Sequence, residues 1–257
     1  MSLVQIIENT FFANGRYWGG LNNSLYRKDA IWSMKTGIDS ADLNMVWSEK
    51  PLAAGDCPTI RFIQDDFRKA GLPFWWWIFP RAQSVQTDTI LKNEGYAIIE
   101  SIPSMIADLA VIPDQNFLHS SLEVIEIKNK RELLLWGDIS FRGFEFPPET
   151  RKQYDTFVHT FNIQDGSPQK FFLAFLNGEP KATALLFLHQ GTGGIYFVTT
   201  LLGSRKKGIG LAVTLSAMLT AKRAGAKYCT LQSSPAGFRV YQRAGFQEFC
   251  RVNVYSR

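Results

Sequence analysis

The sequence has 257 residues, of which 46% are hydrophobic, 14% aromatic and 20% charged, a composition that supports a buried core and excludes global disorder. The formal net charge of +5 is unevenly spread: residues 1–119 carry ten basic and thirteen acidic side chains (net −3), and residues 120–257 carry eighteen and ten (net +8). Because ten cations and one acid, Glu248, follow Thr200, the C-terminal quarter is expected to attract a polyanion or a phosphorylated small molecule.

The cysteines and the apolar segments exclude several other classes of protein. Cys57, Cys229 and Cys250 are too few and too scattered for a disulfide framework or a cysteine metal site. The longest apolar run, residues 72–80, is too short to span a membrane, and the N-terminus lacks the pattern of a signal peptide. We therefore expect a cytoplasmic protein that holds no metal and does not bind a membrane.

The first half of the chain contains one prominent apolar strand. A predicted helix ends at Gly71, the strand covers residues 74–79, and a turn at Pro80 leads to a second helix that ends before Gly95 and Tyr96. Within this strand, alternation places Trp76 on the face opposite Trp75 and Trp77. The three tryptophans are interpreted as part of a core strand; the alternative is an aromatic wall of an acceptor pocket or of a domain interface.

The second half has a longer series of predicted elements. Helices are expected near Glu132 and Arg151, and they are followed by a hairpin around the Asn177-Gly178 turn. A turn at residues 191–194 then precedes a strand at 195–202. The later elements are a helix at 208–225, a strand at 228–232, a helix at 238–244 and a strand from 246 to 255.

The two halves share the order helix, Ala-Gly, strand, proline-containing turn, helix, and Gly followed by an aromatic residue. In the first half the glycines are Gly71 and Gly95, and in the second half they are Gly225 and Gly245. This order indicates the duplication of one unit, with a boundary near residues 114–120 and domains at 1–118 and 119–257. The alternative is chance, because such patterns are common in α/β chains.

The basic segment Arg205-Lys206-Lys207-Gly208-Ile209-Gly210 lies between a predicted strand and a predicted helix. The two glycines let backbone amides approach a ligand, the helix N-terminus adds unpaired N–H groups, and the cations can bond to phosphate. The pattern suits a pyrophosphate, although it matches neither the P-loop nor the Rossmann turn. The alternative is a solvated basic turn with a glycine that caps the helix.

Together, Arg205-x-x-Gly208-x-Gly210 after a strand and Tyr241-x-x-x-Gly245-Phe246 after the next helix and strand resemble the GNAT superfamily of acyl-CoA N-acyltransferases. The resemblance covers about residue 171 to the C-terminus, with weaker support from about residue 123. It implies an α/β fold with two GNAT-like domains in tandem, each a mixed, mainly antiparallel sheet flanked by helices. It also implies acetyl-CoA as the acyl donor.

The resemblance assigns roles to individual residues. It implies that the pyrophosphate of coenzyme A is held by Arg205, Lys206, Lys207, Gly208, Ile209 and Gly210. It implies that the pantetheine arm is bound by backbone groups of Val198, Thr199 and Thr200. Tyr241 matches the tyrosine that protonates the departing thiolate; the alternative is a buried packing tyrosine. Ser233 and Ser234 are expected to bond to the pantetheine or the carbonyl, or else to cap the following helix.

The first half departs from the family pattern where the cofactor would bind. Residues 51–56, which align with the basic loop, contain no Lys or Arg and include Asp56, and Leu91 occupies the place of Tyr241. The first half is therefore expected to be a degenerate GNAT-like domain, as in tandem members such as mycothiol synthase. Its expected role is to shape a substrate cleft or to stabilise the fold.

The sequence does not identify the general base. Candidates are Glu145 and Glu149, for which the alternative is solvated loop carboxylates, and Tyr196, for which it is a strand aromatic. For the isolated His159 and His189 the alternative is a surface or core histidine. The predicted activity is direct acetyl transfer from acetyl-CoA to an amine of an unidentified small molecule. The alternative is a non-catalytic acyl-CoA-binding or regulatory module. Nucleic-acid binding is disfavoured, because the cations gather in the cofactor loop and no recognition helix or stacking motif is present.

Overall fold

The computed structural model describes residues 1–112 and 121–257, which form two compact units. The first unit is Met1–Ser104 together with Phe249–Arg257, and the second is Met105–Glu248. Two strands belong partly to each unit: β5 (Ala97–Asp108) starts in the first, and β11 (Gln247–Ser256) starts in the second. The predicted boundary between residues 118 and 119 lies outside the described residues and stays a prediction. The units differ from two continuous halves, because the C-terminal segment packs with the first unit.

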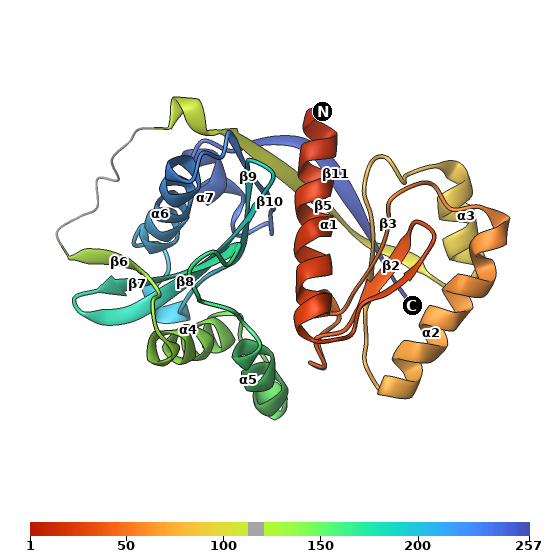
Figure 1. The fold of residues 1–257 in the computed structure, drawn as a ribbon, viewed down its shortest axis with the longest axis horizontal. Helices are drawn as coiled ribbons and strands as arrows, with labels where there is room; N and C mark the ends of the chain where they lie inside the picture. Colours follow the sequence, from red (N-terminus) through yellow and green to blue (C-terminus); the bar gives the residue numbers. More distant parts are fainter. Residues whose placement is uncertain (113–120) are drawn as a thin grey trace. The chain divides into compact units, whose positions relative to one another are not determined.

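The first unit contains three helices and a mixed sheet (Figure 1). Its strands lie in the order β1-β2-β3-β4-β11-β5, with β3 and β4 parallel and the pairs β1–β2, β2–β3 and β4–β11 antiparallel. In chain order, the elements besides β5 and β11 are α1 (Leu3–Leu21), β1 (Tyr26–Lys28), β2 (Ile31–Met34), β3 (Met45–Ser48), α2 (Cys57–Ala70), β4 (Trp75–Ile78) and α3 (Val85–Asn93).

The tryptophan run forms strand β4, as the sequence predicts. Trp75 and Trp77 lie on one face, with ring centroids 5.8 Å apart, and Trp76 is fully buried on the other face. There the Trp76 ring packs edge-on against Tyr96 at 5.6 Å, and its indole N–H donates to the Ser48 hydroxyl at 3.2 Å. The interpretation as a core strand is therefore confirmed.

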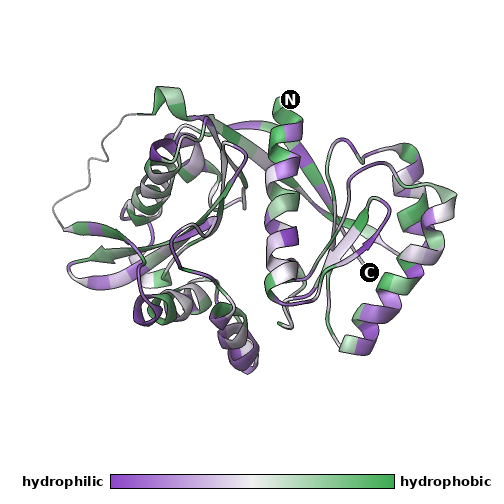
Figure 2. Cartoon of the chain, in the orientation of Figure 1, coloured by the Kyte–Doolittle hydropathy of each residue, from purple (hydrophilic) through white to green (hydrophobic). Residues whose placement is uncertain are grey.

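Helix α2 covers this core with one apolar face. Apolar and polar residues alternate along it (Figure 2), and its buried side chains recur three and four residues apart, at Thr59, Ile60, Ile63 and Phe67. The helix ends at Gly71, whose φ of 67° is the left-handed conformation that glycine adopts at low cost.

The second unit has a sheet with strand order β5-β10-β9-β8-β7-β6 (Figure 1). Strands β6 to β9 pair in antiparallel fashion, and β10 joins β9 in parallel. Its helices and its strands other than β5 are β6 (Leu122–Glu126), α4 (Lys130–Gly143), α5 (Arg151–His159), β7 (Gln169–Leu176), β8 (Glu179–His189), β9 (Thr192–Thr200), α6 (Ile209–Arg223), β10 (Tyr228–Gln232) and α7 (Phe238–Arg243). Among the described residues, none of the helices is both long enough and apolar enough to cross a bilayer.

Helices α6 and α4 cover opposite faces of this second sheet. Phe172 of β7 lies in the core cluster that contains the α6 residues, whereas its neighbour Phe171 packs edge-on against Trp136 of α4 at 5.2 Å. Since successive strand residues point to opposite faces, the two helices sandwich the sheet. The predicted mixed, mainly antiparallel architecture flanked by helices is confirmed for each unit.

One predicted turn is placed differently in the structure. The turn between β8 and β9 lies at Gln190 and Gly191, with φ values of 45° and 73°, and Thr192–Gly194 already belongs to β9. Two consecutive residues with positive φ make a tight hairpin, so the two later glycines of the predicted turn are strand residues. At Gly193, a Cβ would lie 2.8 Å from the Leu186 side chain, which explains the glycine by close packing.

Candidate active site

Strands β9 and β10 of the second unit pair over only part of their length. Within the described chain, the parallel register joins Thr192, Gly193 and Gly194 to residues 228–230 and goes no further. Strand β9 nevertheless continues to Thr200, and β10 continues to Gln232. The facing edges of the two strands therefore have backbone groups that do not pair with each other, and such groups can bond to an extended ligand.

A β-bulge shapes β9 three residues after Gly194, the last residue that pairs with β10. Phe197 has a φ of 50°, and the β8–β9 register shifts by one residue between Thr183 and Leu185. The Thr183 hydroxyl donates a 2.8 Å hydrogen bond to the Phe197 carbonyl. This bond satisfies a buried acceptor and fixes the bulge.

The three pantetheine candidates follow the bulge directly. Val198 packs against the core cluster beneath α6, and Thr199 is buried against Gly143, where a Cβ would lie 2.6 Å from the threonine methyl. The Thr200 hydroxyl points towards Gly210, 3.5 Å from the place a Cβ would occupy there. The part of β9 that does not pair with β10 thus leads towards the N-terminus of α6.

The basic loop ends at a helix N-terminus without a side-chain cap. Gly208 occupies the N-cap position with a φ of 80°, and Lys206 also has a positive φ, of 62°. The first turn of a helix has N–H groups with no intrahelical acceptor and carries a partial positive charge. The Ile209 side chain is buried in the core, so only its backbone can contribute to a ligand site, as at Gly210.

Arg205 differs from the two lysines that follow it. Its guanidinium donates to the carbonyls of Thr200 (3.0 Å) and Gly143 (3.1 Å) and to the Glu145 carboxylate (2.8 Å). Lys206 and Lys207 are exposed, and within the described residues neither forms an ion pair. The structure therefore presents the lysines as the available cations and Arg205 as a link between loops; phosphate binding by all three stays a prediction.

Tyr241 lies in α7, one turn after the loop that follows β10. It is buried, its ring centroid is 6.1 Å from that of Phe246, and a Cβ on Gly237 would lie 2.6 Å from the ring. Burial raises the pKa of its hydroxyl further above neutral pH. The packing role is present in the structure, and the role as an acid stays a prediction.

The two serines make local contacts. The Ser234 hydroxyl accepts from the Gly237 N–H at 3.2 Å within the turn before α7. Helix α7 itself has no side-chain cap at its N-cap residue Gly237, so Ser234 does not cap the helix in the predicted way. Ser233 is buried, and its hydroxyl donates to the Ser234 carbonyl at 2.9 Å. Contact with pantetheine remains a prediction for both.

The two candidate glutamates and Tyr196 lie in different settings. Glu145 follows α4 and is paired with Arg205, whereas Glu149 is exposed in a short 3-10 helix, Pro148–Thr150. Tyr196 lies over Gly194, where a Cβ would be 2.6 Å from its ring, and burial raises its pKa. None of the three stands out as the base from these contacts alone.

The two candidate histidines lie in different places, and His189 is at the end of β9 opposite the basic loop. His189 ends β8 and pairs with Thr192, the first residue of β9, while the basic loop follows Thr200. At about 3.3 Å per residue, these two ends of β9 are roughly 25 Å apart. His159 ends α5, is exposed, and its Nδ1 lies 2.6 Å from the Asp155 carbonyl.

Three contributors to the site were not found from the sequence: Thr183, Phe197 and Gly143. Thr183 is an ordinary β-branched strand residue, and the bulge at Phe197 has no glycine or proline to signal it. A glycine next to an aromatic residue at the end of a helix was the only available signal for Gly143. Their importance depends on pairing between strands and on close approach across the sheet, which a linear pattern does not encode.

No protein-family model matches this sequence, and no curated protein is significantly similar to it. Solved structures are similar over most of the chain. A GCN5-related N-acetyltransferase from Kribbella flavida has a TM-score of 0.72 at 17% identity, over 96% of this chain and 94% of that one. A GCN5-related N-acetyltransferase from Sphaerobacter thermophilus has a TM-score of 0.65 at 17% identity, over 89% and 76%.

A tandem GNAT protein from the clavulanic acid biosynthesis pathway is also similar, with a TM-score of 0.58 at 9% identity, over 88% of this chain and 78% of that one. These likenesses show that the chain has the GCN5-related N-acetyltransferase fold in a tandem arrangement. The fold expected from the resemblance is confirmed.

Proposed function

We propose that this protein is an N-acetyltransferase that moves an acetyl group from acetyl-CoA to an amine of a small molecule, with its acyl-CoA site in the second unit. The observation that carries the proposal is the continuity of β9: its edge parts from β10, passes through the bulge at Phe197 and leads into the basic N-terminus of α6. The fold shared with GCN5-related N-acetyltransferases supports this assignment.

Different residues of the second unit are proposed to bind different parts of acetyl-CoA. Lys206, Lys207 and the first N–H groups of α6 supply positive charge and donors for a pyrophosphate. The backbone of Val198 and Thr200 offers donors and acceptors to the amide groups of the pantetheine arm. Arg205 holds the loop in place through its bonds to Thr200 and Gly143.

The chemistry is direct acyl transfer. A neutral amine attacks the thioester carbonyl carbon, a C–N bond forms, the C–S bond breaks, and the amine loses a proton to a base or to water. The proposed donors to the developing oxyanion are backbone N–H groups at the bulge. The proposed role of Tyr241 is to donate its proton to the departing thiolate. Its hydroxyl carries a proton at neutral pH, although burial raises its pKa and so makes it a weaker acid.

The first unit offers no comparable site for a pyrophosphate. The segment that aligns with the basic loop forms a short 3-10 helix, Ala54–Asp56, in which the Asp56 carboxylate accepts from the Ala53 N–H at 2.8 Å. An acid held at this position repels phosphate. We therefore propose one acyl-CoA site per chain.

The experiment compares two ligands and two charge-reducing variants by calorimetry. Coenzyme A carries the pyrophosphate, and S-acetylpantetheine lacks it. The Lys206→Gln/Lys207→Gln variant is expected to weaken coenzyme A binding at least about tenfold and to leave S-acetylpantetheine unchanged. The matched control, Arg223→Gln/Lys227→Gln, removes the same charge near the other end of α6 and is expected to bind both ligands as the wild type does.

If both double variants weakened coenzyme A binding equally, the effect would be due to net charge alone. If Lys206→Gln/Lys207→Gln did not weaken coenzyme A binding, the basic loop would not be part of the site. The alternative function, acyl-CoA binding without turnover, is favoured by one observation: Tyr241 packs within the core against Phe246. A chain that binds coenzyme A but transfers acetyl to none of a panel of amines, amino acids and peptides would support that alternative.

A further inference from the structure

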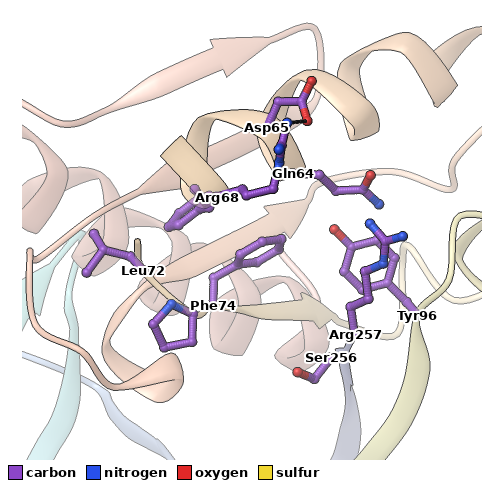
Figure 3. Close-up of a pocket in the computed structure, with 10 residues that line it drawn as sticks. Gln64, Asp65, Arg68, Leu72, Phe74, Tyr96, Ser256 and Arg257 are labelled. Carbon is purple, nitrogen blue, oxygen red and sulfur yellow. Dashed lines mark hydrogen bonds and ion pairs between the residues drawn. The ribbon is translucent and has the colours of Figure 1, made fainter. Parts of the chain in front are cut away.

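The first unit contains a pocket that the proposed acetyl transfer does not use (Figure 3). It encloses about 300 Å³ between α2, the turn before β4, the start of β5 and the end of β11. Aromatic walls come from Phe67, Phe74 and Tyr96, and polar groups come from Gln64, Ser256 and Arg257. These residues lie along the C-terminal half of α2 and beyond it, whereas the counterpart of the cofactor loop precedes α2. The pocket is therefore separate from the degenerate cofactor position.

The second unit repeats the same order of elements, and the residues that match the pocket lining there are buried in the hydrophobic core. Aligning Gly71 with Gly225 matches Gln64 to Met218, which is fully buried. Tyr96 follows Gly95 as Phe246 follows Gly245, and Phe246 is also buried. The first unit therefore has an amide and a phenol where the second has purely apolar side chains.

Besides the amide and the phenol, the two units also differ in the side chain that lies over the matching glycines, Gly95 and Gly245. A Cβ at Gly245 would meet the Ile112 side chain at 2.8 Å, whereas a Cβ at Gly95 would meet the Arg257 Nε at 3.1 Å. Ile112 is buried in the core of the second unit. Its counterpart Arg257 is exposed and borders the pocket, so the first unit has an opening lined by a cation where the second unit is filled by an aliphatic side chain.

The Tyr96 hydroxyl is the buried polar group of the pocket. Tyr96 is 3% exposed, and its hydroxyl oxygen completes no hydrogen bond of ordinary geometry within the described chain. Burial raises its pKa, and Gln64 beside it lowers the pKa in part, while the Gln64 amide donates at 3.0 Å to the Glu94 carbonyl. In Figure 3 the hydroxyl points into the space between Gln64 and Phe74. A buried phenol in this state lacks the partner that a ligand oxygen would supply.

The charges around the pocket leave one cation available. Arg68 is paired with Asp65 at 2.9 Å, and Glu94 is held by two bonds from Arg61, at 2.8 and 2.9 Å. Within the described residues, Arg257 has no carboxylate within ion-pair distance. Arg257 is nevertheless near enough to Glu94 to lower the pKa of that carboxyl. The pocket thus combines an aromatic wall, a phenolic donor and a guanidinium that forms no ion pair with a described carboxylate.

We propose that this pocket binds a small aromatic carboxylate. Its ring lies against Phe67, Phe74 and Tyr96, whose neighbouring centroids are 4.4 and 6.0 Å apart, and its carboxylate accepts from Arg257 and from the Tyr96 hydroxyl. The volume lies at the lower end of the range for ligand pockets, which suits about ten non-hydrogen atoms. Binding at this pocket does not depend on acetyl transfer in the second unit.

The test uses phenylacetate and its neutral analogue phenylacetamide in calorimetric titrations of the full chain. Phenylacetate is expected to bind with a dissociation constant near about 1 mM, as its size allows, and phenylacetamide at least about tenfold more weakly. Arg257→Gln and Tyr96→Phe are each expected to weaken phenylacetate about tenfold or more. Tyr96→Phe installs the residue found at the matching place in the second unit, so it is expected to fold.

The control variant is Arg223→Gln, which removes an exposed cation from the second unit and is expected to bind phenylacetate normally. Coenzyme A titrations accompany each variant, and Arg257→Gln is expected to leave coenzyme A binding unchanged. Absence of saturable phenylacetate binding overturns the proposal, as does equal binding of the amide or full binding by Arg257→Gln. None of these results bears on the acyl-CoA site.

Discussion

The guanidinium of Arg205 lies 2.8 Å from the carboxylate of Glu145, and it also bonds to the Gly143 carbonyl. The loop after α4 is thereby tied to the loop that opens α6. The sequence predicts that Arg205 binds phosphate and makes Glu145 a candidate base. In the structure these two side chains form an ion pair with each other. In the proposed acyl-CoA site, the Glu145 carboxylate beside the basic loop would therefore compete with a pyrophosphate for Arg205.

Replacing Glu145 with Gln is expected to strengthen coenzyme A binding. The pair is largely exposed, at 43% and 58% of its side chains, so its loss should change the unfolding free energy by less than about 1 kcal/mol. Removing the competing charge should raise coenzyme A affinity about two- to fivefold at low ionic strength, and the gain should fade near about 0.5 M salt. Calorimetry at both salt concentrations measures this. Glu149→Gln is the control, and weaker binding by Glu145→Gln would contradict the competition.

Replacing Tyr241 with Phe separates the two interpretations of that residue. The ring packing on Phe246 is kept and only the hydroxyl is lost. If Tyr241 protonates the thiolate, kcat should fall about 100-fold while coenzyme A affinity stays unchanged. Tyr255→Phe, a buried tyrosine of the first unit, serves as the control for the substitution itself. Unchanged turnover would leave Tyr241 with a packing role only.

Replacing Thr183 with Val tests the bulge. The variant keeps the side-chain shape but removes the donor to the Phe197 carbonyl, and leaving that carbonyl without a partner should cost about 1–3 kcal/mol. Urea unfolding measures the loss, and kcat should fall as the bulge loosens. Thr156→Val, at an exposed position of helix α5, should cost less than about 0.5 kcal/mol. Full stability together with full turnover in Thr183→Val would show that the bulge does not depend on this bond.

Replacing Arg61 with Gln should change the acid stability of the first unit. Arg61 donates two bonds to Glu94 and lowers the pKa of that carboxyl below 4.5. A carboxyl whose folded pKa is depressed contributes stability above its unfolded pKa, and the contribution disappears as the pH falls through the folded value. The variant should therefore unfold at lower urea than the wild type at pH 7, and the two curves should converge below about pH 4.

The control for this pair is Arg68→Gln, which removes a cation from the more exposed pair with Asp65 on the same helix. It should shift the pH 7 midpoint less than Arg61→Gln does. A difference between Arg61→Gln and the wild type that persists unchanged at low pH would mean that Arg61 acts through packing and not through the charge of Glu94.

Local chemistry made much of the second unit predictable. The Asn177-Gly178 turn, the helix that starts after Gly208 and the strand at residues 228–232 follow from backbone preferences and apolar periodicity within short windows. The turn at residues 191–194 was misplaced because glycine serves equally for a turn and for close packing. Only the neighbouring Leu186 shows that Gly193 is needed for the second reason.

The sequence by itself determined the fold class, the duplication and the position of the basic loop, because each depends on residues close together along the chain. The tertiary structure alone decided what the side chains of that loop meet. Arg205 is held by a residue sixty positions away, and the bulge at Phe197 is fixed by Thr183 on a neighbouring strand. It also decided that Tyr96, Gln64 and Arg257 gather around one pocket, since strand pairing within the first unit unites segments that are far apart in the chain.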